Sequence, residues 1–130
     1  MTEHPNAVAI RRAYEAFASG DGETLRNQFT EDVLFHVQGL GDLDGDYRGP
    51  DQVFEFFGKL AAETDGTFRL ELHTVLADDD HTATLLAQNG ERKGRTLSGN
   101  VVHIAHMRDG RTSEFWAAFT DPVNTVAFWQ

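Results

Sequence analysis

The sequence contains no cysteine among its 130 residues. Disulfide bonds, thiolate nucleophiles and sulfur-ligated metal sites are therefore excluded. Basic residues are also scarce, because 11 lysines and arginines stand against 21 aspartates and glutamates, which gives a net charge of −10. A charge of this sign repels phosphate backbones and anionic lipid surfaces, so we expect neither nucleic acid nor a membrane as a partner.

Long apolar runs are absent as well. No apolar segment approaches the length of a membrane span, and residues 1–5 lack the basic and apolar regions of a secretory signal, so we expect a cytoplasmic protein. The length fits a single domain over residues 1–130. Ten phenylalanines, two tryptophans and two tyrosines supply large side chains for a core and for the wall of a cavity within it.

The hydrophobic periodicity changes along the chain. Helical spacing predicts helices over 5–19, 22–29 and 50–61, and a glycine-rich loop is expected over 39–49. Alternation predicts strands over 33–37, 68–72, 81–89, 95–108 and 111–119, with chain reversals expected at 89–90, 93–94 and 109–110. Helices followed by an antiparallel meander predict an α+β fold, in which one curved sheet carries helices on one face.

Two histidines interrupt apolar strands. His36 lies in the run 33–37, and His103 lies in the run 101–105. Burial of an imidazole costs free energy unless it is hydrogen-bonded. Alternating strand residues share a face, which puts His36 with Leu34 and His103 with Val101. We predict that both rings project into one cavity, where they could relay a proton; the alternative is that both are ordinary core or sheet-edge histidines.

Several segments resemble the nuclear transport factor 2-like superfamily, and within it the SnoaL-like polyketide cyclases and the ketosteroid isomerase relatives. These segments are residues 10–17 (IRRAYEAF) with 20–21, 35–37 (FHV), 47–49 (YRG), 102–103, 108–111 (RDGR) and 114–116 (EFW). The resemblance implies a cone-shaped α+β fold of the cystatin-like type, a hydrophobic pocket between the concave sheet and the N-terminal helices, and commonly a homodimer. Because this superfamily includes both enzymes and binding modules, the fold alone does not assign a function.

The chain also departs from these relatives. Val37 stands where the steroid isomerases carry their carboxylate base, so steroid isomerase activity is not expected. His103 matches the position of their oxyanion donor, whereas their catalytic tyrosine aligns nearer Ala13 than Tyr14. The SnoaL-type cyclases use an acidic base late in the chain, for which Asp121 is the nearest candidate, although its place before a proline is also what a helix cap requires.

The predicted site combines catalytic and ligand-binding residues. The candidate catalytic residues are His36, His103 and Asp121. The candidate ligand-binding residues are the possible hydrogen-bond donors Tyr14 and Trp116 and the aromatic wall of Phe17, Tyr47, Phe54 and Phe57. The alternative role for these aromatic residues is packing in the hydrophobic core. No metal site and no cofactor is expected, because the acidic run 42–46 departs from a calcium loop and no dinucleotide-binding turn is present.

We therefore expect a SnoaL-like domain that binds a small hydrophobic molecule, with three hypotheses for its role. The first is an isomerase, cyclase or dehydratase that works by histidine acid–base chemistry. The second is a carrier or sensor without turnover, and the third is a dimerisation module without a ligand. Val102 and Ile104 lie on the strand face opposite His103, which predicts a homodimer joined through the outer face of the sheet.

Overall fold

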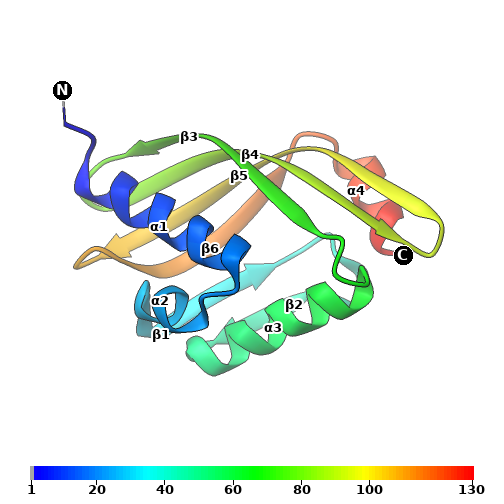
Figure 1. The fold of residues 1–130 in the computed structure, drawn as a ribbon, viewed down its shortest axis with the longest axis horizontal. Coiled ribbons are helices and arrows are strands. Elements are labelled where there is room, and N and C mark those ends of the chain that lie inside the picture. The colour runs from blue at the N-terminus through cyan, green and yellow to red at the C-terminus, as the bar shows by residue number, and fades with distance from the viewer. Residues whose placement is uncertain (1) are drawn as a thin grey trace.

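The computed structural model describes residues 2–130 (Figure 1). The elements are α1 (Pro5–Ser19), α2 (Gly22–Asn27), β1 (Phe29–Val37), the 3-10 turn η1 (Gly41–Leu43), β2 (Gly45–Arg48), α3 (Gly49–Glu63), β3 (Arg69–Ala77), β4 (His81–Arg92), β5 (Arg95–Arg108), β6 (Arg111–Phe119) and α4 (Pro122–Trp129). No helix in the described residues is long and apolar enough to cross a membrane.

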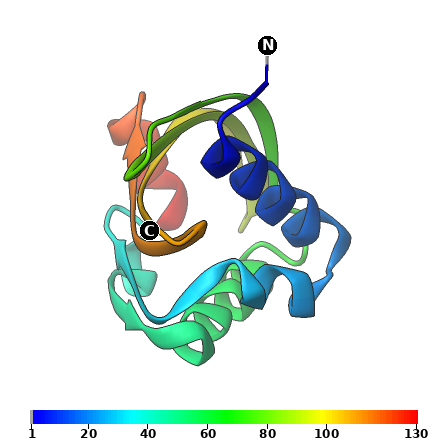
Figure 2. The ribbon, with the colours of Figure 1, turned by 90° about the vertical axis from the view of Figure 1, so that its left-hand side faces the viewer.

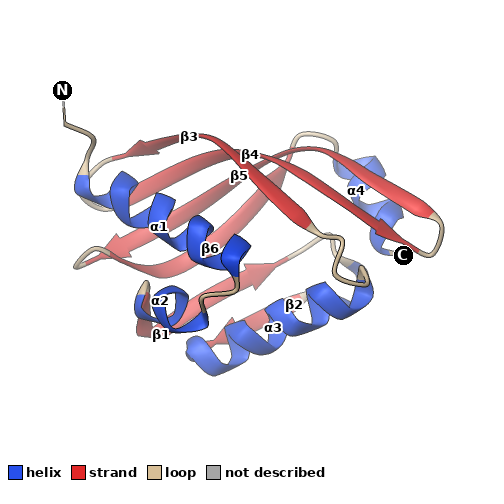
Figure 3. Ribbon diagram, viewed as in Figure 1, coloured by secondary structure: helices blue, strands red, loops and turns tan. Residues whose placement is uncertain are grey.

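The strands form one six-stranded sheet in the order β2-β1-β6-β5-β4-β3 (Figure 3). All neighbouring pairs are antiparallel except β1 and β6, which are parallel. Helices α1, α2 and α3 come from the N-terminal half of the chain, and the meander β3 to β6 comes from the C-terminal half. The predicted α+β class is confirmed.

The sheet is strongly curved, and helices close its concave side (Figure 2). Helix α1 packs along β3, and α3 packs along β1 and β2. Each helix buries one apolar stripe, which includes Ile10 and Ala16 in α1 and Val53, Phe56 and Leu60 in α3. This amphipathic spacing leaves polar residues outside and directs the apolar side chains into the curve of the sheet.

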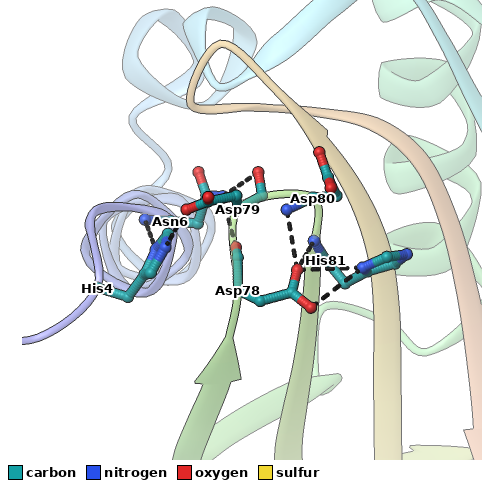
Figure 4. A network of polar contacts seen from close by, with 6 residues as sticks. All are labelled: His4, Asn6, Asp78, Asp79, Asp80 and His81. Atoms are coloured by element: carbon teal, nitrogen blue, oxygen red, sulfur yellow. Dashed lines mark hydrogen bonds and ion pairs between the residues drawn. The ribbon is translucent and has the colours of Figure 1, made fainter.

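A polar network fixes the start of α1 to the turn between β3 and β4 (Figure 4). The His4 side chain caps the helix by accepting a hydrogen bond from the Asn6 backbone N–H at 3.0 Å. The Asn6 side-chain amide donates to the carbonyl oxygens of Asp78 and Asp79 at 2.9 and 3.1 Å. Because α1 carries one side of the cavity, this anchor fixes the position of that helix relative to the sheet.

Two local expectations are wrong, and both involve glycine. Residues 45–48 of the expected loop form strand β2, because their main chain pairs with the edge of β1 from Leu34 to Val37. The expected reversal at Gly90 does not occur, and β4 continues to Arg92. Gly90 pairs with Leu97 of β5, and a Cβ there would make only ordinary van der Waals contact with Phe68, so the glycine is a regular strand residue.

Candidate functional site

A cavity of about 120 Å³ lies between the concave face of the sheet and the helices α1 and α3. Its wall is mostly aromatic and aliphatic, with Phe17 from α1, Phe57 from α3 and Phe115 from β6 among its members. Within residues 2–130, no aspartate, glutamate, lysine or arginine contributes to this wall. The cavity is therefore an apolar compartment in which each polar group has a large influence on what can bind.

Tyr14 and His103 form the central polar contact of this cavity. Helix α1 places the Tyr14 hydroxyl oxygen 2.5 Å from Nδ1 of His103, and the two rings stack with their centroids 5.8 Å apart. Phe115 presses against the imidazole in an edge-to-face arrangement at 4.8 Å. The strand register pairs His103 with Ala117 on one side and with Thr84 on the other, so these side chains share the concave face.

Burial keeps both partners neutral. It raises the pKa of Tyr14 well above its usual range, and it lowers the pKa of His103 to about 3. A hydrogen bond from Thr84 to the Tyr14 oxygen acts in the opposite direction on the tyrosine pKa, but burial dominates. In a neutral pair the tyrosine can donate its O–H to Nδ1 of the imidazole, which is the tautomer protonated at the other ring nitrogen. The second ring nitrogen of His103, Nε2, then carries the hydrogen.

In that tautomer the cavity offers a ligand one donor on His103, its Nε2–H group. The hydrogen bonds of His103 in the described part of the chain involve Nδ1, and none involves Nε2. Two further polar atoms of the wall, Thr82 Oγ1 and Gln88 Nε2, are buried and also lack a protein partner within residues 2–130. Buried polar atoms without a partner are uncommon in native proteins, so these two in one apolar cavity mark it as a candidate binding site.

The structure does not bring His36 together with His103. The His36 ring stacks on Trp116 at 5.1 Å, with Nδ1 3.0 Å from a carboxylate oxygen of Asp46 and Nε2 2.7 Å from one of Glu114. Its strand neighbours Phe35 and Val37 are buried on the concave side, and strand alternation directs the His36 imidazole to the other face. His36 contributes to the cavity wall, but its ring is turned to the carboxylates of the outer face, so the prediction that both rings project into one cavity is wrong.

The environment of His36 is also electrostatically opposite to that of His103. The hydrogen bond to Glu114 raises the pKa of His36, and Asp46 adds to the effect, while partial burial opposes it. His106 approaches the same Glu114 carboxylate at 3.3 Å and contacts Trp116 edge-to-face at 4.8 Å. These residues form an outer-face cluster, which we define as His36, His106, Glu114, Asp46 and Trp116. Trp116 therefore belongs to this cluster and does not form the floor of the cavity.

Three other predicted site residues lie outside the cavity wall. Asp121 caps α4, where its side chain accepts a hydrogen bond from the backbone N–H of Asn124 at 3.3 Å, so the helix-cap alternative holds. The Tyr47 hydroxyl donates to the carbonyl of Leu43 at 2.6 Å, and its ring packs on Phe56. Phe54 packs in the core against Phe29 and Phe57. None of these three residues lines the cavity, and each makes a structural contact outside it.

Sequence reasoning missed the polar residues of β4. Thr82, Thr84 and Gln88 all line the cavity and are at least nine-tenths buried. The signal that could have found them is strand alternation, since they share one face with the fully buried Leu86. Three polar residues on the buried face of a strand are unusual for a plain core and more typical of a binding surface.

Comparison with known proteins shows the family. Residues 10–115 match the model of the SnoaL-like domain. The chain belongs to the SnoaL-like family. The protein Rv0034 of Mycobacterium tuberculosis, which is uncharacterized, is 35% identical over 133 residues, and the match covers 99% of each chain. This SnoaL-like chain therefore has a relative that matches it over nearly its full length.

Solved structures of the same fold agree with the assignment. Bal32a, from a soil-derived mobile gene cassette, superposes with a TM-score of 0.91 at 33% identity, over 97% of each chain. IdmH of Streptomyces antibioticus, a proposed polyketide cyclase, superposes with a TM-score of 0.77 at 26% identity, over 95% of this chain and 97% of its own. The comparisons thus show the nuclear transport factor 2-like fold and the likeness to polyketide cyclases. The class of ligand is argued below from the geometry of the cavity.

Proposed function

We propose that this SnoaL-like domain binds a small, mostly apolar molecule whose carbonyl or hydroxyl oxygen accepts a hydrogen bond from His103 Nε2–H. The observation that carries the proposal is a fixed, neutral donor in a wall without charged side chains. Tyr14 holds the imidazole in this tautomer, because its hydroxyl occupies Nδ1. A ligand oxygen would satisfy a donor that the protein leaves without a partner, and this preference is worth about 1–3 kcal/mol.

The size of the cavity limits the ligand. A cavity of about 120 Å³ is slightly smaller than an engineered apolar cavity of about 150 Å³ that admits benzene. We therefore propose a compound with a single aromatic or alicyclic ring for the conformation described here. The absence of a basic side chain in the described wall disfavours an anionic ligand, since nothing there would compensate its desolvation.

Enzymatic turnover is the second candidate function, and the likeness to IdmH favours it. A neutral His103 is a poor general base at pH 7, because its pKa of about 3 lies far below that pH. As a donor, however, it can stabilise negative charge that develops on a ligand oxygen during enolisation, as an oxyanion hole does. A reaction of isomerase, cyclase or dehydratase type would then take its base from the ligand or from water.

Ligand binding is tested with two probes that differ in one group, acetophenone and ethylbenzene, titrated by NMR of the isotope-labelled protein. Acetophenone should bind the wild type more tightly, and His103→Phe should remove the difference by weakening acetophenone by about 1–3 kcal/mol. Ethylbenzene affinity should stay the same, because it makes no hydrogen bond. Equal affinities of the two probes for the wild type would refute the proposed donor.

Turnover is separated from carriage by hydrogen–deuterium exchange. Acetophenone in heavy water exchanges its methyl hydrogens through an enolate, which forms when a base removes a methyl proton and which carries the negative charge on its oxygen. An enzyme-like site should accelerate this exchange above the buffer rate, and His103→Phe should abolish the acceleration. Binding without acceleration would assign the carrier or sensor role.

We also propose that the protein forms a homodimer through the outer face of the sheet. Leu85 and Ile104 on this face are each 39% exposed, and the register sets Leu85 opposite Val102. Neighbouring apolar side chains on an exposed sheet are typical of a surface that a partner covers. A second copy is the partner that a self-complementary face on one chain fits.

A further inference from the structure

The Gln88 side chain is a buried amide that the proposed hydrogen bond to His103 does not use. It is 4% exposed, lines the cavity, and its Nε2 has no hydrogen-bond partner within residues 2–130. The strand register places Leu70 on one side of it and Gly99 on the other, and neither offers a polar side chain. The amide can present either a donor or an acceptor, so it can meet either type of ligand atom.

No side chain stands directly across the sheet from this amide on β5. A Cβ built on Gly99, the direct neighbour of Gln88 across the sheet, would contact nothing within 4 Å. Residues that face each other across antiparallel strands present their side chains on the same face. The glycine therefore places no side chain beside Gln88, and the hollow that Gly99 itself lines is a separate one against α4.

Gln88 and His103 mark two separate positions along the cavity. His103 lies opposite Thr84, and Gln88 follows Thr84 by four residues on the same face of β4. Four residues of a strand correspond to about 13 Å between their Cα atoms. Both residues line the same cavity, so one ring with an oxygen at each end would lie between them.

We propose that Gln88 forms a second polar subsite, which selects ligands that carry a neutral oxygen at the end opposite the one that His103 binds. This inference rests on the proposed function of the cavity and names its ligand class, a ring with oxygen substituents at opposite positions. A neutral second group is specified, because an amide without a nearby cation does not compensate the burial of a carboxylate. Gln88 is assigned to ligand specificity, and the donor at His103 to affinity for the first oxygen.

The experiment is a cycle of two proteins and two probes. The probes are 4-hydroxyacetophenone and 4-methylacetophenone, which differ only in the group expected at Gln88, and the proteins are the wild type and Gln88→Met. The ratio of the two affinities should be about 2- to 12-fold more favourable to the hydroxyl compound in the wild type than in Gln88→Met. An unchanged ratio, as expected if a buried water is the sole partner of the amide, overturns the proposal.

Thr82→Val is the matched control, because it removes the other unpartnered atom of the cavity wall. It should leave the ratio of the two probes at the wild-type value. A ratio lost in Thr82→Val and kept in Gln88→Met would overturn the assignment to Gln88. If Gln88→Met does not fold, the NMR signal of the Gln88 side-chain amide in the wild type provides the test. This signal should shift when the hydroxyl probe is added and stay in place when the methyl probe is added. Equal shifts with the two probes overturn the proposal.

The two proposals fail in different ways. If acetophenone keeps its preference over ethylbenzene while the two para-substituted probes show no coupling to Gln88, the His103 donor stands and the Gln88 subsite falls. If coupling to Gln88 is present and the acetophenone preference is absent, the donor assignment falls. No detectable binding of any probe up to its solubility overturns both.

Discussion

The buried His103 should make the stability of the protein depend on pH in a specific way. The unfolded chain binds a proton on this residue near its ordinary pKa of 6.5, whereas the folded protein does so only near 3. Between these values the unfolded state holds more protons, so the free energy of unfolding falls as the pH falls. At about 1.4 kcal/mol for each pH unit, this interval corresponds to about 5 kcal/mol of lost stability, as an upper limit.

Replacement of His103 by phenylalanine isolates this contribution. At neutral pH the variant should be less stable than the wild type by about 1–3 kcal/mol, because the Tyr14 hydroxyl loses its acceptor. In acid the variant no longer carries the proton-linked loss, so it should become the more stable of the two. The two stability curves should cross between about pH 4 and 6, where the linked loss equals the cost of the missing hydrogen bond.

Urea unfolding followed by circular dichroism measures both curves at a series of pH values. Other groups that titrate in acid, such as Asp32 and Asp78, whose pKa values are lowered by hydrogen bonds, affect both proteins and cancel in the difference. His73→Phe, on the exposed side of β3, is a control for the loss of an imidazole at the surface. Parallel curves for the wild type and His103→Phe would show that His103 is not held neutral, and the argument for a neutral donor would fail.

Three further predictions concern the outer face and the helix anchor. Glu114 raises the pKa of His36, so this pair stabilises the fold fully below about pH 6.5 and less as the pH rises through the raised value. In urea unfolding at a series of pH values, Glu114→Gln should reduce this decline in the free energy of unfolding. The same decline in the variant and the wild type would contradict the prediction. Asn6→Ala should cost about 1–3 kcal/mol, because two hydrogen bonds to backbone carbonyls are lost, and a loss within error of an exposed Thr2→Ala control would refute the anchor. Ile104→Asp should convert a dimer to a monomer in sedimentation at micromolar concentration, whereas a monomeric wild type would disprove the interface.

The sequence predicted most of the fold because the periodic signals are strong. Helix α1 begins at Pro5 and ends at Ser19, as the apolar spacing and Gly20 indicate, and the long strands β5 and β6 run over the predicted residues. What could not be predicted is pairing at a distance and its effect on glycine. Strand β2 forms along the edge that β1 offers it, and Gly90 stays in a strand through its pairing with Leu97 of β5.

The site was predicted in part, because alternation assigns a face within a strand but does not say which face is concave. In β1, apolar residues occupy both faces, so hydrophobicity alone could not separate Phe35 from Leu34. The structure decides the matter through α3 and β6: Phe57 packs edge-to-face on Phe35, and Phe115 stacks on it at 4.2 Å. His36 is therefore turned to the outside, where carboxylates were available to pair with it.

The contrast between the two histidines restricts any chemistry of the cavity. Both lie in apolar strands, yet His36 meets two carboxylates and its pKa rises, whereas His103 meets a neutral tyrosine and its pKa falls to about 3. A proton relay between them is excluded by their positions on opposite faces of the sheet. His103 in its neutral form can donate from Nε2, and the described cavity wall contributes no carboxylate to remove a proton from carbon. A ligand that reacts here must therefore carry its own base or be acidic enough for water to deprotonate it once its oxygen is bound, and any other ligand would be bound unchanged.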